Sequence, residues 1–292
     1  MSNRESSSRK AATARRSLFA ATRYHAAGLF ISLLFIAPIA WSALVSFKPS
    51  AEAARPPLPP WPVEGFSTQS YENLQKYGVG IWTYVGNSLT VAVATVVVTV
   101  IISLLAGYGF SRFKFPLKNL VFVLIISTVM IPFQSILTPL FLILTKLGLQ
   151  NTLSGIVLIY VTLHLPFSIF MMRNAFDAVP KEIEDAARVD GASVLLMLRR
   201  VMLPLVLPGV ATVAIFAFLA SWNEFLAALI LLTDQKKYTL PVMMAAVRSG
   251  QFGTIDWGAV QSGVMLMMAP CLALFLLLQR YYIRGLTAGA VK

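Results

Sequence analysis

Six long apolar stretches constrain this chain more than any other feature of its sequence. They lie at about residues 28–47, 83–107, 119–144, 151–172, 205–232 and 257–280. A helix needs roughly 20 apolar residues to cross about 30 Å of hydrocarbon, and lipid offers the backbone no other hydrogen-bond partner. The sequence therefore predicts an all-α membrane protein with six transmembrane helices. Prolines inside these stretches predict kinks at Pro38, Pro132, Pro139, Pro166, Pro208 and Pro270.

Successive loops between the apolar stretches lie on alternate sides of the membrane, and lysine and arginine are distributed unequally between the two sides. Seventeen of the 24 lie in the N-terminal segment, after the second and fourth stretches, and at the C-terminus. The positive-inside rule then predicts that both termini and the segment 180–200 are cytoplasmic, and that the loop 48–82 is external. The net charge of +12 follows these loops. This distribution indicates membrane topology rather than binding to nucleic acid.

Two segments outside the apolar stretches have unusual compositions. Residues 1–25 are basic and rich in Ser and Ala, which is typical of a disordered segment that touches anionic lipid. The proline-rich part of the external loop, residues 55–62, predicts an extended chain that serves either as a docking surface or as a spacer. A cleaved signal peptide is the alternative for the first stretch, but its apolar run exceeds the about 7–15 residues of a signal sequence.

The common nucleotide-binding, metal-binding and hydrolase motifs are missing from the sequence. It contains no GxxxxGK[ST], HExxH, CxxC or GxSxG motif. The two histidines, His25 and His164, are far apart, and Cys271 is the single cysteine. We expect no catalytic residue, cofactor or metal site, and we interpret His164 as a hydrogen-bonded core residue rather than a ligand.

One carboxylate stands well inside an apolar stretch. Glu224 follows Asn223 in SWNEF, residues 221–225. A charge at that depth is costly unless it faces partners or water. Two interpretations remain open: a polar wall of a translocation path, or a tie to Asn87, Ser88 or a backbone group. The candidate path residues are therefore Asn87, Ser88, Asn223 and Glu224.

The segment between the fourth and fifth stretches is too polar to span a membrane. Pro180 suits the first position of a helix, and acids at 182, 184 and 185 suit its positive end. Gly191 can take positive φ and end this helix, and Ser193 can cap the next one, which begins at Val194. The pattern predicts a helix, a bend and a second helix at the cytoplasmic face, either as a docking element or as a solvated connection.

This segment resembles the loop signature of inner-membrane permeases of ABC importers: EAA, three residues, Gly, nine residues, then Ile-x-Leu-Pro. Asp185, Ala186 and Ala187 stand at EAA, and Gly191 has the required spacing. Val201, Met202, Leu203 and Pro204 close the motif. Asp185 replaces Glu and Val201 replaces Ile. SFKP (46–49), GNSL (86–89), SRFKFP (111–116), WNEF (222–225) and RGLTAGAVK (284–292) narrow the likeness to carbohydrate-uptake permeases of the MalG-like type.

The resemblance implies a six-span permease domain over residues 26–292, with a coupling helix in segment 180–200. It implies import of a sugar or oligosaccharide, a second permease subunit, cytoplasmic ATPase subunits and an external solute-binding protein. The ATPase-coupling role carries over to Glu184, Asp185, Ala186, Ala187, Asp190 and Gly191. An importer of another small solute, such as a polyamine, is the alternative. A stand-alone secondary carrier and a membrane enzyme fit the sequence less well.

Overall fold

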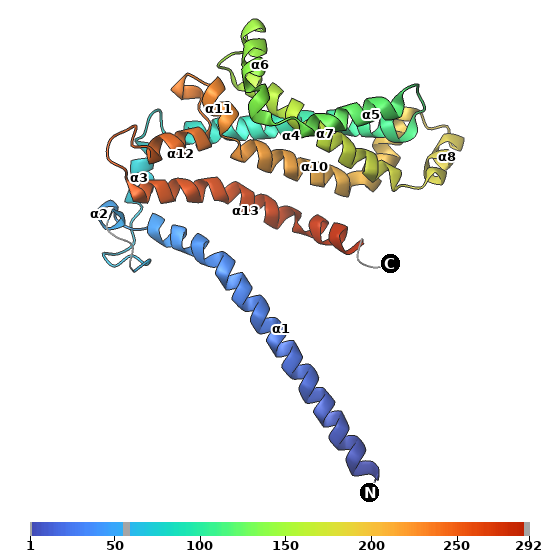
Figure 1. Cartoon of the computed structure of the whole chain (residues 1–292), viewed down its shortest axis with the longest axis horizontal. Coiled ribbons are helices and arrows are strands. Elements are labelled where there is room, and N and C mark those ends of the chain that lie inside the picture. Colours follow the sequence, from blue (N-terminus) through green and yellow to red (C-terminus); the bar gives the residue numbers. More distant parts are fainter. Residues whose placement is uncertain (1, 55–58, 289–292) are drawn as a thin grey trace. The chain divides into compact units, whose positions relative to one another are not determined.

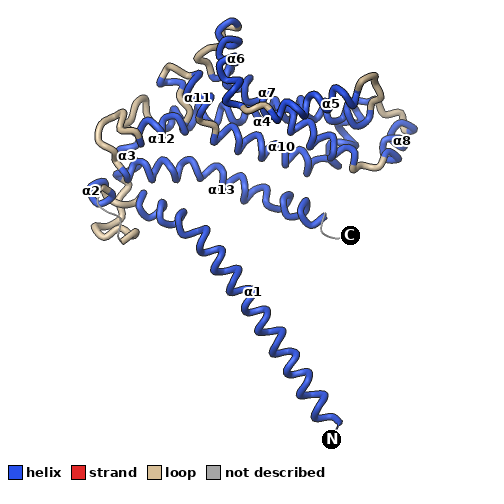
Figure 2. The backbone as a smooth tube through the Cα atoms, viewed as in Figure 1, coloured by secondary structure: helices blue, strands red, loops and turns tan. Residues whose placement is uncertain are grey.

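All regular elements in the described part of the chain are helices (Figure 2). The computed structural model describes residues 2–54 and 59–288. Four of the helices long and apolar enough to cross a membrane lie within α1 (Ser2–Ser46), α4 (Ile81–Arg112), α7 (Leu153–Asp177) and α13 (Trp257–Ala288). The segment Val194–Asn223 is the fifth. The number of candidate spans is six if the bent pair of helices at Lys118–Met130 and Phe133–Lys146 is counted as one span.

The bent pair occupies the third apolar stretch, for which the sequence predicts a single span. Here α5 (Lys118–Ser127) continues as a 3-10 turn (Thr128–Met130), and α6 (Phe133–Lys146) leaves at 104°. Pro132 stands at this break, where it cannot donate a helical hydrogen bond. The other five prolines of the predicted kinks lie within helices. Figure 1 shows α6 directed away from the layer that contains α4 and α7.

The chain divides into two units, the larger of which contains residues 73–255 and 266–288. Its centre is α4 packed along α7 and α10 (Leu203–Asn223). Glycines allow close approach, because a Cβ on Gly107 would lie 2.6 Å from that of Met172, and one on Gly209 would lie 2.7 Å from that of Ala175. The missing side chains of Gly107 and Gly209 thus let α4 and α10 pack closely against α7.

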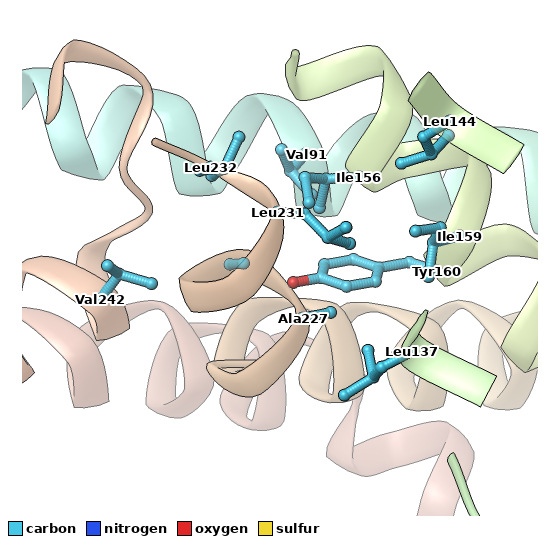
Figure 3. Close-up of a cluster of buried hydrophobic side chains, with 11 residues drawn as sticks. Val91, Leu137, Leu144, Ile156, Ile159, Tyr160, Ala227, Leu231, Leu232 and Val242 are labelled. Atoms are coloured by element: carbon cyan, nitrogen blue, oxygen red, sulfur yellow. The ribbon is translucent and has the colours of Figure 1, made fainter. Parts of the chain in front are cut away.

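Two apolar clusters fill this larger unit. One surrounds Tyr160 with side chains from several helices: Val91, Leu137, Leu144, Ile156, Ile159, Ala227, Leu231, Leu232 and Val242 (Figure 3). The other joins Tyr108 of α4 and Phe176 of α7 to Met197, Met202 and Val206. The second cluster anchors the polar segment that follows α7, as described below.

The fifth apolar stretch, expected over about 205–232, is divided. Its first helix, α10, ends at Asn223, and α11 covers Leu226–Leu231. A 3-10 turn (Gln235–Lys237) and α12 (Leu240–Arg248) follow before α13. The break falls at Glu224, whose backbone is extended with ψ 131°. The single carboxylate of this stretch therefore marks the end of a helix rather than its interior.

The smaller unit contains residues 2–54, 59–72 and 256–265. Its helix α1 begins at Ser2, so the basic segment up to residue 25 is helical where the sequence predicts disorder. The reason is that Ala, Arg and Lys, which are frequent in this segment, are good helix formers. Within α2 (Ser50–Ala53), Glu52 accepts hydrogen bonds from the amides of Val63 and Glu64 at 3.0 Å. Lys48 Nζ lies 3.1 Å from Glu52 Oε1. Part of the proline-rich stretch 55–62 lies outside the described residues.

A third helix follows the proline-rich stretch. The helix α3 (Gln69–Gln75) contains Ser70 in its first turn, and the hydroxyl of Ser70 donates to Lys48 O at 3.1 Å. A Cβ on Gly258 would lie 2.2 Å from that same hydroxyl oxygen. The part of the expected external loop that belongs to the smaller unit is therefore folded on itself and against the start of α13.

Candidate functional site

The polar segment after α7 forms a short amphipathic helix, α8 (Lys181–Val189). The sequence predicts Pro180 as its first residue, but Pro180 is the N-cap and the helix begins one residue later, at Lys181. Glu182 and Glu184 occupy the first turn and Arg188 the last, so the charges complement the helix dipole. The sequence thus places α8 correctly as a non-spanning helix between two apolar helices.

A bend closes α8 through a Schellman motif. Gly191 has φ +79°; its amide donates to Arg188 O at 3.0 Å, and the amide of Ala192 donates to Ala187 O at 3.0 Å. Ser193 then caps α9 (Val194–Met197) by accepting from the amide of Leu196 at 3.4 Å. A π-helical turn (Leu198–Met202) leads into α10. The predicted helix, glycine bend and capped second helix are confirmed.

A buried ion pair fastens α8 to the end of α4. Arg112 Nε donates to Glu184 Oε1, and both side chains are only 4% exposed. Arg112 Nη2 also donates to Val179 O at 2.7 Å, and Ser111 Oγ donates to Asp177 Oδ1. Two consecutive residues of α4 therefore hold both the end of α7 and the start of α8.

The six candidate coupling residues divide between the two faces of this segment. Glu184 points into the protein, and Ala187 packs against the cluster of Tyr108 and Phe176. The other four, Asp185, Ala186, Asp190 and Gly191, are exposed. Asp185 Oδ1 lies 3.5 Å from Arg188 Nη1 on the open side. Asp185, the acid at the EAA position, is thus accessible to a partner protein. Glu184, the acid before it, is buried in an ion pair within the chain.

Exposed apolar side chains stand on both sides of the bend. We call this set the bend patch; it consists of Ile183, Val189, Val194, Leu195 and Leu196. Val189 is 88% exposed and Leu195 73% exposed. Apolar side chains gathered on a polar connecting segment are typical of a surface that another protein covers.

The four candidate path residues do not form one group. Asn87 Nδ2 donates to Lys236 O and Tyr238 O at 2.9 Å, and Ser88 Oγ accepts from the amide of Leu240 at 2.8 Å. Both side chains of α4 thus fasten the connection that leads into α12. Asn223 Nδ2 returns to Leu219 O of its own helix at 2.7 Å.

Glu224 caps the helix that follows it. Its Oε1 accepts from the amide of Ala227 at 2.8 Å, its Oε2 from the amide of Ala228 at 3.2 Å, and Tyr160 Oη donates to Oε2. The predicted tie to a backbone group is therefore present, and the tie to Asn87 or Ser88 is not made. Figure 3 shows the hydroxyl of Tyr160 directed toward the turn of α11.

A cavity of about 410 Å³ opens beside this carboxylate. Its polar lining comes from Thr128, Tyr160, His164, Ser168 and Glu224, and its remaining walls are apolar. His164 Nε2 is buried and makes no hydrogen bond within the described part of the chain. This nitrogen therefore lacks the hydrogen bond that is expected of a core histidine. Of the four candidate path residues, Glu224 lines this cavity and the other three do not.

Sequence reasoning missed three residues of these sites. Arg112 belongs to a quoted motif, SRFKFP, but nothing in its spacing shows that it reaches Glu184, which lies 72 positions away. Tyr160 and His164 differ by one helical turn and so share a face of α7, a signal that was available. Among the described residues, no cluster of three or more His, Cys, Asp or Glu side chains fits a metal ion.

The fold and the polar segment together define a multi-pass helical membrane protein with a structured helix, α8, between two of its apolar helices. Comparison with known proteins agrees. Residues 99–287 match the family described as "binding-protein-dependent transport system inner membrane component". The chain belongs to this family of ABC importer permeases, and it is therefore a multi-pass protein of the inner membrane.

Relatives of known description cover nearly the whole chain. The diacetylchitobiose uptake system permease protein NgcG of Streptomyces coelicolor is 32% identical over 92% of this chain and 88% of its own length. The trehalose/maltose transport system permease protein MalG of Thermococcus litoralis is 34% identical over 90% and 94%. The arabinooligosaccharides transport system permease protein AraQ of Halalkalibacterium halodurans is 33% identical over 90% and 93%.

A solved structure supports the fold. A crystal structure of a bacterial ABC transporter involved in import of the acidic polysaccharide alginate contains a chain that matches with a TM-score of 0.76 and 23% identity. The match covers 91% of this chain and 96% of that one. The predicted ABC importer permease fold is confirmed.

Proposed function

We propose that this chain imports a sugar or an oligosaccharide as one permease subunit of an ATP-driven, binding-protein-dependent importer. The uptake systems of its relatives act on diacetylchitobiose, on arabinooligosaccharides and on trehalose or maltose. These solutes share the chemistry of short glycans, which favours a sugar over a polyamine. The chain would form half of the path beside a second permease subunit and receive its solute from an external binding protein.

Coupling to ATP hydrolysis would run through α8 and the bend after it. The observation that carries this proposal is the division of α8 into a buried, ion-paired side and an exposed side. A cytoplasmic ATPase subunit that covers Asp185, Ala186 and the bend patch would move α8. Because Arg112 and Glu184 join α8 to α4, that movement would reach the membrane helices as a rigid displacement. The ATP would be hydrolysed on the separate subunit.

Glu184 and Asp185, two of the three acids of α8, would therefore have different roles. Asp185 would contact the ATPase, whereas Glu184, assigned to the same role from the sequence, would position α8 on α4. Gly191 would preserve the bend, since only a residue that accepts φ +79° joins α8 to α9 in this geometry. Both termini would be cytoplasmic, as the distribution of lysine and arginine predicts.

The cavity beside Glu224 is our candidate for this subunit's part of the translocation path. It combines a carboxylate, a phenol and an imidazole with apolar walls, and its ring pair Phe167 and Phe216 lies at 5.4 Å between centroids. Such a surface suits hydroxyl-rich solutes, which present both polar edges and apolar ring faces. Asn87 and Ser88 would instead hold the connection to α12.

The test is solute-stimulated ATP hydrolysis by the reconstituted importer. We expect Asp185→Lys to reduce stimulation strongly, and Gly191→Pro to abolish it, because proline fixes φ near −65°. The matched control is Glu72→Lys, an exposed acid in the predicted external loop. Normal stimulation in both α8-region variants would disprove coupling through this segment. Stimulation by spermidine, without stimulation by any member of a panel of short glycans, would disprove the sugar substrate.

A further inference from the structure

A second cavity, of about 450 Å³, lies where α4 turns into α5. We call it the basic pocket; Lys114, Phe115, Leu117, Lys118, Asn119, Leu120 and Arg173 line it. Three of these side chains are cations and none is an acid. The volume falls in the range of about 300–1,000 Å³ that is typical of small-ligand sites.

The cations of the basic pocket are only partly neutralised. Arg173 Nε lies 3.5 Å from Asp177 Oδ2, and its guanidinium stacks over the Phe122 ring at 4.1 Å. Lys118 Nζ donates to the carbonyls of Phe113 at 3.0 Å and Ser111 at 3.5 Å. Within the described part of the chain, neither Lys114 nor Lys118 pairs with a carboxylate. The pocket therefore retains positive charge that an anion can neutralise.

The surroundings of the basic pocket are apolar and open. Leu117, Leu120, Val121, Val123 and Leu124 are all exposed, and no residue of α5 is buried. Leu117 takes a left-handed conformation with φ 59°, which turns the chain so that the lysines and this apolar strip adjoin. An anion that carries long apolar chains satisfies both surfaces at once.

We propose that the basic pocket binds the phosphate of one anionic phospholipid from the cytoplasmic leaflet, with its acyl chains along α5. Basic pockets between membrane helices at this level are suited to lipid head groups. The level follows from the proposed topology, in which the turn between α4 and α5 is cytoplasmic. An acidic surface of a partner protein would complement the three cations but would leave the apolar strip of α5 in contact with water or protein charge.

The basic pocket adjoins the ion pair that holds α8. Lys118 donates to the carbonyls on both sides of Arg112, and Arg112 in turn holds Glu184. A phosphate bound to Lys118 therefore stabilises the turn that positions α8. Importer activity should rise with the anionic lipid content of the membrane.

The direct test measures lipid retention and does not depend on transport. The permease assembly is reconstituted in vesicles of equal parts phosphatidylcholine and phosphatidylglycerol, and native mass spectrometry counts the phosphatidylglycerol that it retains. We expect Lys114→Gln to weaken retention about fivefold, since each basic side chain near an anionic lipid contributes about 1 kcal/mol. Lys114→Arg should restore it. Lys146→Gln, an exposed lysine remote in sequence, should retain lipid as the natural chain does.

Several results would overturn the proposal. One is unchanged retention in Lys114→Gln, whose exposed side chain leaves folding unaffected. Another is an equal loss in Lys146→Gln, which would indicate a general effect of charge. Displacement of the lipid by inorganic phosphate would show a free-anion site, and displacement by added ATPase subunits would show a protein interface.

Discussion

Glu184 and Glu224 are two carboxylates that the same chain shields in different ways. Glu184 is buried against a guanidinium that arrives from another helix. Glu224 is half-buried and accepts hydrogen bonds from two backbone amides of the helix that follows it and from the hydroxyl of Tyr160. The first carboxylate joins elements distant in sequence, so it can transmit displacement. The second ends one helix and starts another, so it shapes a cavity wall.

The comparison predicts the largest effect at the buried ion pair. Arg112→Gln should destabilise the larger unit by about 3–5 kcal/mol, because it removes the buried guanidinium from the carboxylate of Glu184 and leaves it only the half-exposed Arg188, whose Nη2 lies 3.8 Å from Oε2. Adding Glu184→Gln should recover much of that loss. Denaturant unfolding of the purified permease assembly would measure both. Equal destabilisation by the single and double variants would show that the charge pair is not the source of the effect.

Substitution of Glu224 should have a smaller effect on stability than substitution of Arg112. Glu224→Ala removes the acceptor of two amides and a hydroxyl, which should cost about 1–3 kcal/mol. Glu224→Gln keeps an acceptor oxygen and should lose less stability. If the carboxylate also lines the path, both variants should slow solute uptake in vesicles. Full uptake by Glu224→Gln would restrict this residue to capping.

Asp185, the exposed neighbour of Glu184, should contribute almost nothing to folding. Its pairing with Arg188 is solvent-exposed, so Asp185→Asn should change stability by about 0.5 kcal/mol or less. The same change should reduce ATPase stimulation, whereas Glu182→Gln, an exposed acid of the same turn, serves as the control. A large loss of stability in Asp185→Asn would contradict the division of α8 into two faces.

Glu52 extends the comparison to a third carboxylate, outside the membrane helices. The amide of Val63, followed by that of Glu64 and by Lys48, lowers the pKa of Glu52. A lowered pKa stabilises the folded loop above the carboxyl's unfolded pKa, and this stabilisation is lost as the pH falls through the lower folded value. We expect the protection of the Val63 and Glu64 amides from hydrogen exchange, measured relative to the intrinsic exchange rate at each pH, to fall in acid. In Glu52→Gln that pH dependence should disappear, and its persistence would assign the effect to another group.

Several features could be read from the sequence because they depend on local rules. Apolar stretches of sufficient length have to form helices in lipid, and the order of acids, Gly191 and Ser193 determines where α8 ends and α9 begins. The motif around Asp185 was sufficient to identify the family. These properties need only near neighbours along the chain, so the pattern of residues is enough to predict them.

Other features depend on which helices become neighbours, and only the tertiary structure decided them. Periodicity does not distinguish Glu184 from Asp185 as the inward acid, because that choice depends on the reach of Arg112 from α4. The third stretch bends by 104° at Pro132, although five other prolines remain within helices. From the sequence, Glu224 could either line a path or bond to another part of the protein. Packing of α7 against the break after α10 places Tyr160 and a cavity beside it. The physical reason is the same in each case: contact between distant residues is set by close packing, which local sequence does not encode.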